Sequence, residues 1–282
     1  MRLNYDLHTH STASDGTLEP EELVQRAAQS NIQVLALTDH DTTAGVAAAA
    51  KEAKLQGIGF VPGVEISATW SGGGIHIVGL GIDPDCALLR EGLDSMREYR
   101  LWRAREIGRR LDESGISGAF EGARRLAGGE VIARPHFARY LIGQGVAPDM
   151  RTVFKRYLVR GKPGYVPSRW ASLEDAVAWI REAGGQAVIA HPARYSLTRT
   201  KLRKLLSEFI ATGGEGLEVV SSSHNRDETR IMALHARDMG MSASMGSDYH
   251  GPENPWVELG RLPELPVGSV PIWRDWKDTP PL

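Results

Sequence analysis

The sequence predicts an α/β protein in which short buried strands alternate with helices and one basic helical segment is inserted. Short apolar runs alternate with helical patterns at both ends of the chain, which is typical of parallel βα units. Residues 90–170 show helical patterns with almost no strand and carry a net charge of +8, from 17 Lys/Arg and 9 Asp/Glu, although the whole chain has −2. We therefore expect an acidic α/β body, residues 1–87 and 171–282, interrupted by a helical domain at residues 88–170.

The composition excludes several classes of protein. With 282 residues, 41% of them hydrophobic and 24% charged, the chain is long enough to bury a sizeable core. A net charge of −2 argues against a nucleic-acid coat or a membrane-surface protein. The single cysteine, Cys86, excludes an internal disulfide framework and a thiolate-rich metal site. Neither a secretory leader nor a spanning stretch is evident, so a cytoplasmic protein is expected.

The first part of the chain reads as strands and helices in turn. Thr17–Leu23 begins a helix, because proline at a first helical position is followed by acidic residues in the first turn. Val34–Thr38 is a continuous apolar run, as in a strand buried on both faces, and it ends in Asp39–His40–Asp41. The next elements expected are a helix at 44–55, which stops near Gly57, and strands at 60–66 and 75–80.

The insert and the second part of the chain follow the same logic. In the insert, helices are expected at 93–113, 118–126, 136–142 and 150–158, followed by the irregular Gly/Pro stretch 160–167. Ser172 caps the next helix, which runs through Ala183. The remaining expected elements are strands at 186–190, 216–220 and 242–247, helices at 201–212 and 226–239, and a proline-rich tail after Gly251.

Two histidines near the start of the chain, His8 and His10, lie two positions apart. Residues two apart in a strand point to the same face, so the two imidazoles would lie side by side, as in half of a metal site. Asp15 follows after a turn that can bring its carboxylate back toward them. A polar hairpin with two surface histidines would explain this stretch equally well, so the interpretation depends on ligands elsewhere.

Further imidazoles and carboxylates stand where the later strands end, which is where parallel α/β proteins place reactive groups. His76 is the exception, because it lies near the start of its strand. A lone histidine at a strand end is more often structural, and a lone carboxylate is often a helix cap, but their repetition favours a metal site. Nitrogen and oxygen ligands without sulfur suit Mn²⁺, Zn²⁺ or Fe²⁺. The candidate ligands, enough for two or three ions, are His8, His10, Asp15, His40, Glu65, His76, His191, Asp248 and His250.

Several short motifs of this chain occur together in one known superfamily. They are Asp6–His10 with Ser14–Gly16, Leu37–Asp41, Gly63–Glu65, His191–Pro192 and Gly246–His250. In these motifs the chain resembles the polymerase-and-histidinol-phosphatase (PHP) superfamily, distant relatives of the amidohydrolases. The resemblance covers the chain apart from its tail and implies a distorted (β/α)7 barrel with a two- or three-metal phosphoesterase centre. The chain looks most like the branch of 3′,5′-nucleoside bisphosphate phosphatases, whose members carry an inserted helical domain.

The resemblance also implies how the metal ligands are grouped. Glu65 would bridge two ions, with His8, His10 and Asp248 completing one, His76 and His191 the other, and Asp15, His40 and His250 holding a third. A bridging carboxylate keeps two cations about 3.5–4 Å apart, the separation at which both can grip one phosphoryl group. A bound water would lose a proton near neutral pH, and the hydroxide, held by Glu65, His8, His10, Asp248 and His191, would attack phosphorus in line. Mn²⁺ is the expected ion.

The expected reaction is that of a phosphoric monoester hydrolase acting on nucleoside 3′,5′-bisphosphates, for example adenosine 3′,5′-bisphosphate to AMP and phosphate. The second phosphate of such a substrate needs cations of its own, and arginine and lysine supply them. Most basic residues of the insert are better read as solvated surface. The candidates for substrate binding are Arg134 and Lys162, then Arg194, His224 and His136.

Other functions fit the same chemistry. A 5′-phosphate-dependent exonuclease on short oligonucleotides, or a phosphatase of another small phosphomonoester such as histidinol phosphate, would use the same ions. A non-catalytic metal-binding module would keep the fold without turnover, but the complete ligand set argues against it. The expected partner is a small nucleotide, with no membrane and no obligate protein partner.

Overall fold

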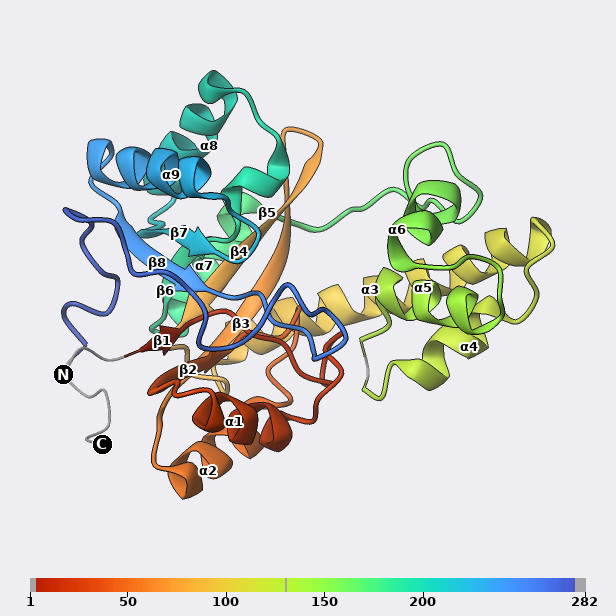
Figure 1. Ribbon diagram of the computed structural model, residues 1–282. Coiled ribbons are helices and arrows are strands. Elements are labelled where there is room, and N and C mark those ends of the chain that lie inside the picture. The colour runs from red at the N-terminus through yellow and green to blue at the C-terminus, as the bar shows by residue number, and fades with distance from the viewer. Residues whose placement is uncertain (1–3, 130, 277–282) are drawn as a thin grey trace.

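Seven strands in the described part of the chain form a nearly closed, barrel-shaped sheet (Figure 1). The computed structural model describes residues 4–129 and 131–276. The amide of Leu7 donates to the carbonyl of Met245 (3.0 Å) and the amide of Asp248 donates to that of His8 (2.9 Å), which joins the first strand to the last. In hydrogen-bonded order the strands are β1 (Tyr5–Asp6), β2 (Val34–Leu37), β3 (Gly59–Trp70), β4 (Gly73–Leu80), β6 (Gln186–Ile189), β7 (Gly216–Ser221) and β8 (Ser242–Gly246). The expected distorted seven-stranded barrel is confirmed.

The expectation of uniformly parallel βα units is wrong for β4, which runs antiparallel to both β3 and β6. Only Ser71 and Gly72 separate β3 from β4, and both have positive φ (49° and 77°). Such a two-residue turn makes a hairpin, whereas a parallel crossover needs a dozen or more residues. As a result, His76 near the start of β4 lies at the edge where the parallel strands end.

Helices cover the outside of the barrel (Figure 1). They are α1 (Pro20–Gln29), α2 (Val46–Gln56), α7 (Leu173–Glu182), α8 (Arg199–Ala211) and α9 (Arg226–Asp238). The predicted signals hold: Pro20 opens α1, Gly57 ends α2 with φ of 69°, and the Ser172 hydroxyl accepts from the Asp175 amide at the start of α7. Leu23 of α1 and Leu35 of β2 share one buried cluster, so the apolar stripe of the helix packs on the sheet.

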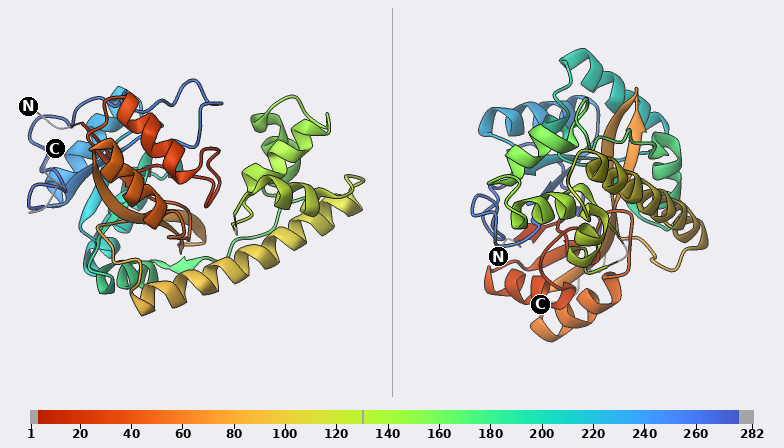
Figure 2. Two further views of the ribbon diagram at one scale, coloured as in Figure 1. Left: turned by 90° about the horizontal axis from the view of Figure 1, so that it is seen from below. Right: turned by 90° about the vertical axis from the view of Figure 1, so that its right-hand side faces the viewer.

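A helical lobe lies beside the barrel and is reached through one long helix, α3 (Ala87–Glu113). Figure 2, in its left view, shows α3 running from the barrel to the far side of the lobe. The lobe contains α4 (Ala119–Leu126), α5 (Arg134–Gly143), α6 (Met150–Val153) and a π-helix at Phe154–Leu158, before the chain returns through β5 (Ala171–Ser172), which pairs with β3. Leu111, Phe137 and Leu158 belong to a hydrophobic core that is separate from that of the barrel.

One detail of the lobe differs from the expected α-helix at 150–158. After Val153 the chain forms a π-helix, closed by a hydrogen bond from the amide of Val159 to the carbonyl of Phe154 (3.2 Å). Such wide turns are often found at functional sites, and Phe154 lines the cleft described below.

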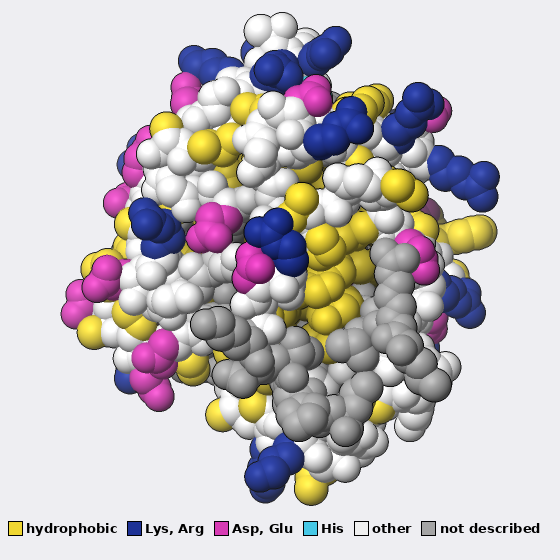
Figure 3. All heavy atoms as spheres, turned by 90° about the vertical axis from the view of Figure 1, so that its left-hand side faces the viewer, with side chains coloured by type: hydrophobic (Ala, Val, Ile, Leu, Met, Phe, Trp, Pro, Cys, Tyr) yellow, Lys and Arg dark blue, Asp and Glu magenta, His cyan; other side chains and the backbone are white. Residues whose placement is uncertain are grey.

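The face opposite the lobe carries scattered Lys/Arg and Asp/Glu side chains around a hydrophobic patch (Figure 3). Among the described residues, no helix is both long and apolar enough to cross a membrane. The 27-residue α3 has the length, but its many arginines rule it out.

Candidate metal centre

The nine predicted ligands lie together at the rim of the barrel where the parallel strands end. The strand ends bring them there from all parts of the chain, and the reversed strand β4 adds its histidine from its beginning. Their positions are His8, His10 and Asp15 after β1, His40 after β2, Glu65 within β3, His76 within β4, His191 after β6, and Asp248 and His250 after β8.

Glu65 is fully buried at the centre of this cluster, and its two carboxylate oxygens face different histidines. Oε2 lies 3.3 Å from Nε2 of both His8 and His10, and 2.8 Å from Nδ1 of His40. Oε1 lies 2.8 Å from Nδ1 of His76 and 3.0 Å from Nε2 of His191. This arrangement suits a carboxylate that bridges two cations.

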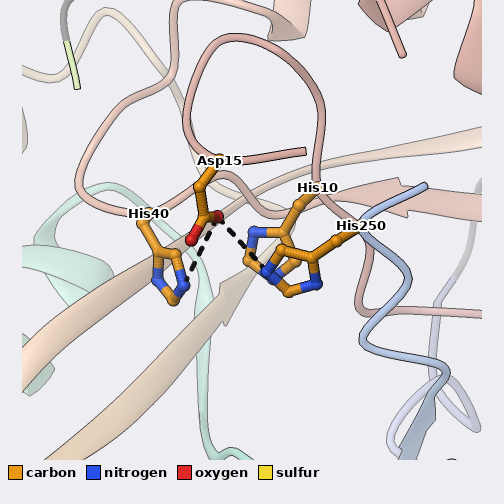
Figure 4. A group of neighbouring side chains, drawn as sticks. All are labelled: His10, Asp15, His40 and His250. Atoms are coloured by element: carbon orange, nitrogen blue, oxygen red, sulfur yellow. Dashed lines mark ion pairs between the residues drawn. The ribbon is translucent and has the colours of Figure 1, made fainter. Parts of the chain in front are cut away.

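The other two carboxylates serve different sides of the cluster. Asp248 Oδ1 lies 3.3 Å from His10 Nε2 and 3.6 Å from His8 Nε2. Asp15 Oδ1 lies 3.2 Å from His250 Nε2 and 3.8 Å from His40 Nε2 (Figure 4). Among the described residues the ligand atoms fall into three sets, and within each set all atoms lie within 4.8 Å of one another. The sets are His8, His10, Glu65 and Asp248; His10, Asp15, His40 and His250; and His40, Glu65 and His76.

The donor atoms in these sets fit bound cations. Several buried side-chain atoms make no hydrogen bond within the described residues: His8 Nε2, His10 Nε2, Asp15 Oδ1, His40 Nδ1 and Glu65 Oε2. These atoms lie at ion-pair distance from one another around the shared centre, but buried polar atoms without hydrogen bonds are costly, and a cation between them would remove that cost. Imidazole nitrogen and carboxylate oxygen together suit Mn²⁺, Zn²⁺ or Fe²⁺.

The electrostatics of the centre favour positive charge between the carboxylates. Burial alone would raise the pKa of Glu65, but His40, His76 and His8 outweigh it and hold that pKa well below its usual range. Burial likewise opposes the charged form of His250, yet Asp15 raises its pKa to about 9. The pKa of His10 falls to about 3 because of burial and the neighbouring His250. The carboxylate of Glu65 thus stays ionised despite its burial and favours positive charge beside it, which suits a bound cation.

Three non-glycine residues at the centre have left-handed backbones: Asp41 (φ 51°), His191 (φ 28°) and Asp248 (φ 56°). Such conformations cost energy and cluster at functional sites, where the surrounding structure enforces them. Asp41 is held by Arg100, whose Nε and Nη2 lie 2.6 Å and 2.5 Å from Asp41 Oδ2.

A cleft of about 220 Å³ opens above the candidate metal ligands, between the barrel and the lobe. Its lobe wall consists of Arg100, Arg103, Ala133, Arg134, Pro135, Phe154 and Trp170. Of the residues predicted to bind substrate, Arg134 and Arg194 line this cleft, and Arg194 Nη1 lies 2.5 Å from Asp248 Oδ2.

The other three predicted substrate residues lie elsewhere. His136 is buried beneath the start of α5, where its Nδ1 accepts from the Ala133 amide at 3.0 Å. Lys162 is exposed and does not line the cleft. His224 also lies outside the cleft lining, and its Nε2 accepts from the Ala193 amide at 3.4 Å. The structure thus brings two of the five predicted residues to the cleft wall.

Sequence reasoning missed four residues that shape the site: Arg100, Arg103, Trp170 and Glu218. The two arginines, one helical turn apart, are buried, and both lie over the ring of Trp170, at 4.7 Å and 5.3 Å from its centroid. Glu218 is a carboxylate within a strand that is buried throughout, which is itself a signal, because such a group needs a partner.

Comparison with known protein families gives a match to the PHP domain over residues 6–102. A 3′,5′-nucleoside bisphosphate phosphatase of Chromobacterium violaceum is 52% identical over 273 residues, which cover 96% of each chain. The 5′-3′ exoribonuclease Rnm of Escherichia coli is 46% identical over 275 residues, covering 97% of this chain and 94% of that protein.

Solved structures agree with these matches. An amidohydrolase from Chromobacterium violaceum, solved with bound sulfate and no metal, has a TM-score of 0.94 and 51% identity, covering 98% of this chain and 96% of that one. A phosphoesterase from Bifidobacterium adolescentis, described as metal-dependent, has a TM-score of 0.83 and 28% identity, covering 93% and 92%.

Proposed function

This chain belongs to the PHP-domain family of metal-dependent phosphoesterases, and we propose that it removes the 3′-phosphate of nucleoside 3′,5′-bisphosphates. The observation that carries the proposal is the two-walled cleft. Metal ligands form its barrel wall and arginines form its lobe wall, so it offers separate places for two phosphate groups. The bisphosphate phosphatase relative, at 52% identity, supports this substrate class.

The barrel wall would hold the phosphate that is removed. When bound, two or three divalent cations, for which we propose Mn²⁺, neutralise phosphoryl charge and lower the pKa of a water molecule. Glu65 would hold a cation at each of its two oxygens, because each oxygen faces a different group of histidines. Arg194 reaches the same wall beside Asp248, where it can orient a phosphoryl oxygen.

The lobe wall would hold the second phosphate. Arg100 is already engaged by Asp41, whereas Arg103, within the described part of the chain, donates only to the carbonyl of Val166. Burial, together with the nearby Arg134 and Arg100, lowers the pKa of Arg103 to about 10, so it remains charged at neutral pH. Arg103 and Arg134 have no carboxylate partner among the described residues, and such arginines in a cleft suit an anionic ligand.

Trimming of short 5′-phosphorylated oligonucleotides is the second candidate, and the exoribonuclease relative at 46% identity favours it. Both reactions remove a group from the 3′ oxygen of a 5′-phosphorylated nucleotide. The bisphosphate phosphatase relative is the more similar of the two, at 52% identity against 46%, which favours the single nucleotide as the main substrate.

A phosphate-release panel in Mn²⁺ tests the proposal. The substrates are a nucleoside 3′,5′-bisphosphate, its 3′-monophosphate, its 5′-monophosphate and a short 5′-phosphorylated oligonucleotide. We expect the highest kcat/KM on the bisphosphate, with the 5′-monophosphate as the product. Equal rates on the bisphosphate and the 3′-monophosphate would contradict a second phosphate pocket, and a preference for the oligonucleotide would favour the exonuclease.

A further inference from the structure

Glu218 lies within β7, behind the metal ligands, and is not itself in any of the three ligand sets. Only 2% of its surface is exposed. A buried carboxylate is costly unless it is hydrogen-bonded or paired, so its contacts indicate what it is for.

Glu218 contacts two predicted metal ligands from different strands. Its Oε1 and Oε2 lie 3.2 Å and 3.4 Å from Nδ1 of His8, and Oε2 also accepts a hydrogen bond from the backbone amide of His191. The other nitrogen of His8, Nε2, points the opposite way, toward Glu65 and Asp248. His8 is therefore held between a carboxylate behind it and the metal centre in front of it.

This arrangement fixes which nitrogen of His8 carries the proton. A neutral imidazole has one N–H donor and one lone-pair nitrogen. With Nδ1–H donating to Glu218, the lone pair is on Nε2, where a cation would bind it. Carboxylate partners of this kind orient ligand histidines and raise their basicity.

The surrounding backbone is shaped to allow these contacts. A Cβ at Gly246 of β8 would lie 2.1 Å from Cβ of His8 and 2.8 Å from Oε1 of Glu218, so only glycine permits this approach. The His191 backbone is left-handed, with φ of 28°, and its amide is the one that donates to Glu218. One carboxylate thus controls the ring of one ligand and the backbone of another.

We infer that Glu218 is a positioning residue that sets the metal affinity of the site containing His8. The inference rests on the metal centre of the proposed function, but not on any particular substrate. A purely structural role would instead affect the stability of the metal-free protein and leave the affinity of the folded protein for metal unchanged.

Calorimetric titration of the full-length, metal-free protein with Mn²⁺ alone tests the inference. The variants are Glu218→Gln, which keeps a hydrogen-bond acceptor but loses the charge, and Glu218→Ala, which loses both. Glu52→Gln is the matched control, because Glu52 is also a hydrogen-bonded carboxylate of low exposure but lies between α1 and α2, away from the centre. Thermal unfolding of each metal-free variant is measured in parallel.

We expect Glu218→Gln to weaken the tightest Mn²⁺ site about 10- to 100-fold and Glu218→Ala to weaken it further, while the control matches the wild type. The Tm of metal-free Glu218→Gln should stay close to that of the wild type. Unchanged Mn²⁺ affinity in both Glu218 variants, or a loss of affinity that merely follows a lowered Tm, overturns the inference. A wild-type protein that binds no Mn²⁺ overturns it together with the metal centre. Wild-type Mn²⁺ binding without phosphate release contradicts only the proposed function.

Discussion

Glu65 has a role that no neighbouring residue can share, because its two oxygens face opposite groups of histidines. A glutamine in its place has one carbonyl oxygen and one amide nitrogen, and the amide cannot ligate a cation as a carboxylate does. We expect Glu65→Gln to retain fewer than two Mn²⁺ ions per chain. Loss of an outer partner alone typically costs about 10–100-fold, so phosphate release should fall by more than about 100-fold.

Metal analysis after reconstitution, alongside phosphate release, checks this prediction. Glu215→Gln serves as the control, since Glu215 is exposed and pairs with Gln186 away from the centre. Full metal content in the Glu65 variant would show that the carboxylate does not bridge ions.

Arg134 tests the lobe wall of the cleft. Its side chain lies over the ring of Phe154, 5.6 Å from the centroid, and after burial its charge is the next cause that lowers the pKa of Arg103. A charge-assisted contact is worth roughly 1.5–3 kcal/mol, so Arg134→Ala should lower kcat/KM on the bisphosphate about 10- to 100-fold. The effect on a 3′-monophosphate should be much smaller.

Steady-state kcat/KM values of Arg134→Ala on the bisphosphate and on the 3′-monophosphate test this prediction. Arg124→Ala, on the exposed surface of α4, is the control. If both substrates lose activity equally, Arg134 serves the reacting phosphate or the structure of the lobe, and the two-pocket account fails.

The sequence could predict most members of the ligand cluster because they stand near strand ends that apolar runs make visible, with His76, near the start of β4, as the exception. Arg100 and Arg103 gave no such signal, since α3 has seven arginines and only tertiary contacts show which two turn inward. Lys162 is the opposite case, a residue that the sequence predicted to bind substrate and the structure does not bring to the cleft. It lies beside a proline in the Gly/Pro stretch 160–167, whose fold leaves it exposed to solvent. Local spacing predicts a residue that acts from its own strand end; it does not predict one that acts across a cleft.

At the scale of single elements, α5 depends on an unusual cap. The Ala133 amide donates to Nδ1 of His136, and Nε2 of the same ring has no hydrogen-bond partner in residues 4–129 and 131–276. Burial lowers the pKa of His136 to about 4, from 6.5 when it is exposed. The unfolded chain therefore takes up a proton at this residue before the folded one, and stability is lost as pH falls from about 6.5 toward 4.

We expect His136→Gln to be less sensitive to acid, because glutamine can accept the same amide hydrogen bond but does not titrate. The free energy of unfolding of the wild type, relative to the variant, should fall by about 2 kcal/mol between pH 7 and pH 5. Denaturant unfolding of the metal-free proteins at the two pH values measures this difference. A constant difference would mean that His136 has the same pKa in the folded and unfolded chain.

The alternating pattern of strands and helices predicted the wrong direction for β4. Ser71–Gly74 contains three glycines in a row, which is a turn signal, and no helical pattern separates the two strands. Strand and helix positions follow from local periodicity, whereas the direction of a strand depends on the length and type of its connection. The antiparallel direction also explains why a histidine near a strand start belongs to the centre.

At the scale of the whole molecule, buried and exposed contacts hold the lobe against the barrel differently. Arg100 of α3 pairs with Asp41 and donates to Ser67 Oγ at 2.8 Å, and both Arg100 and Asp41 are buried. Nη2 of Arg139, on α5, donates to the carbonyl of Asp15 at 2.9 Å. The same nitrogen lies 3.4 Å from Oε1 of the exposed Glu253. The first contact should carry more of the stability, because removing one partner leaves a buried charge alone.

Arg100→Ala should therefore lower the free energy of unfolding by about 3–5 kcal/mol. An exposed control, Arg109→Ala on the same helix, should lower it by less than about 1 kcal/mol. Urea denaturation of the metal-free proteins compares them. Similar losses in the two variants would show that the buried pair does not anchor the lobe.

The joint between β1 and β8 has a mechanical consequence. β1 is only two residues long, and beyond it the chain is held to the last strand by a few hydrogen bonds between residues 7–10 and 245–249. The two segments run parallel, so a force applied between Tyr5, at the start of one, and Gly251, just past the end of the other, pulls along them and loads these bonds together rather than one after another. His8 and His10 lie on one side of the joint and Asp248 and His250 on the other. Ions coordinated by residues on both sides would cross-link the two segments. The force needed to rupture the barrel at this joint should therefore rise when the metals bind.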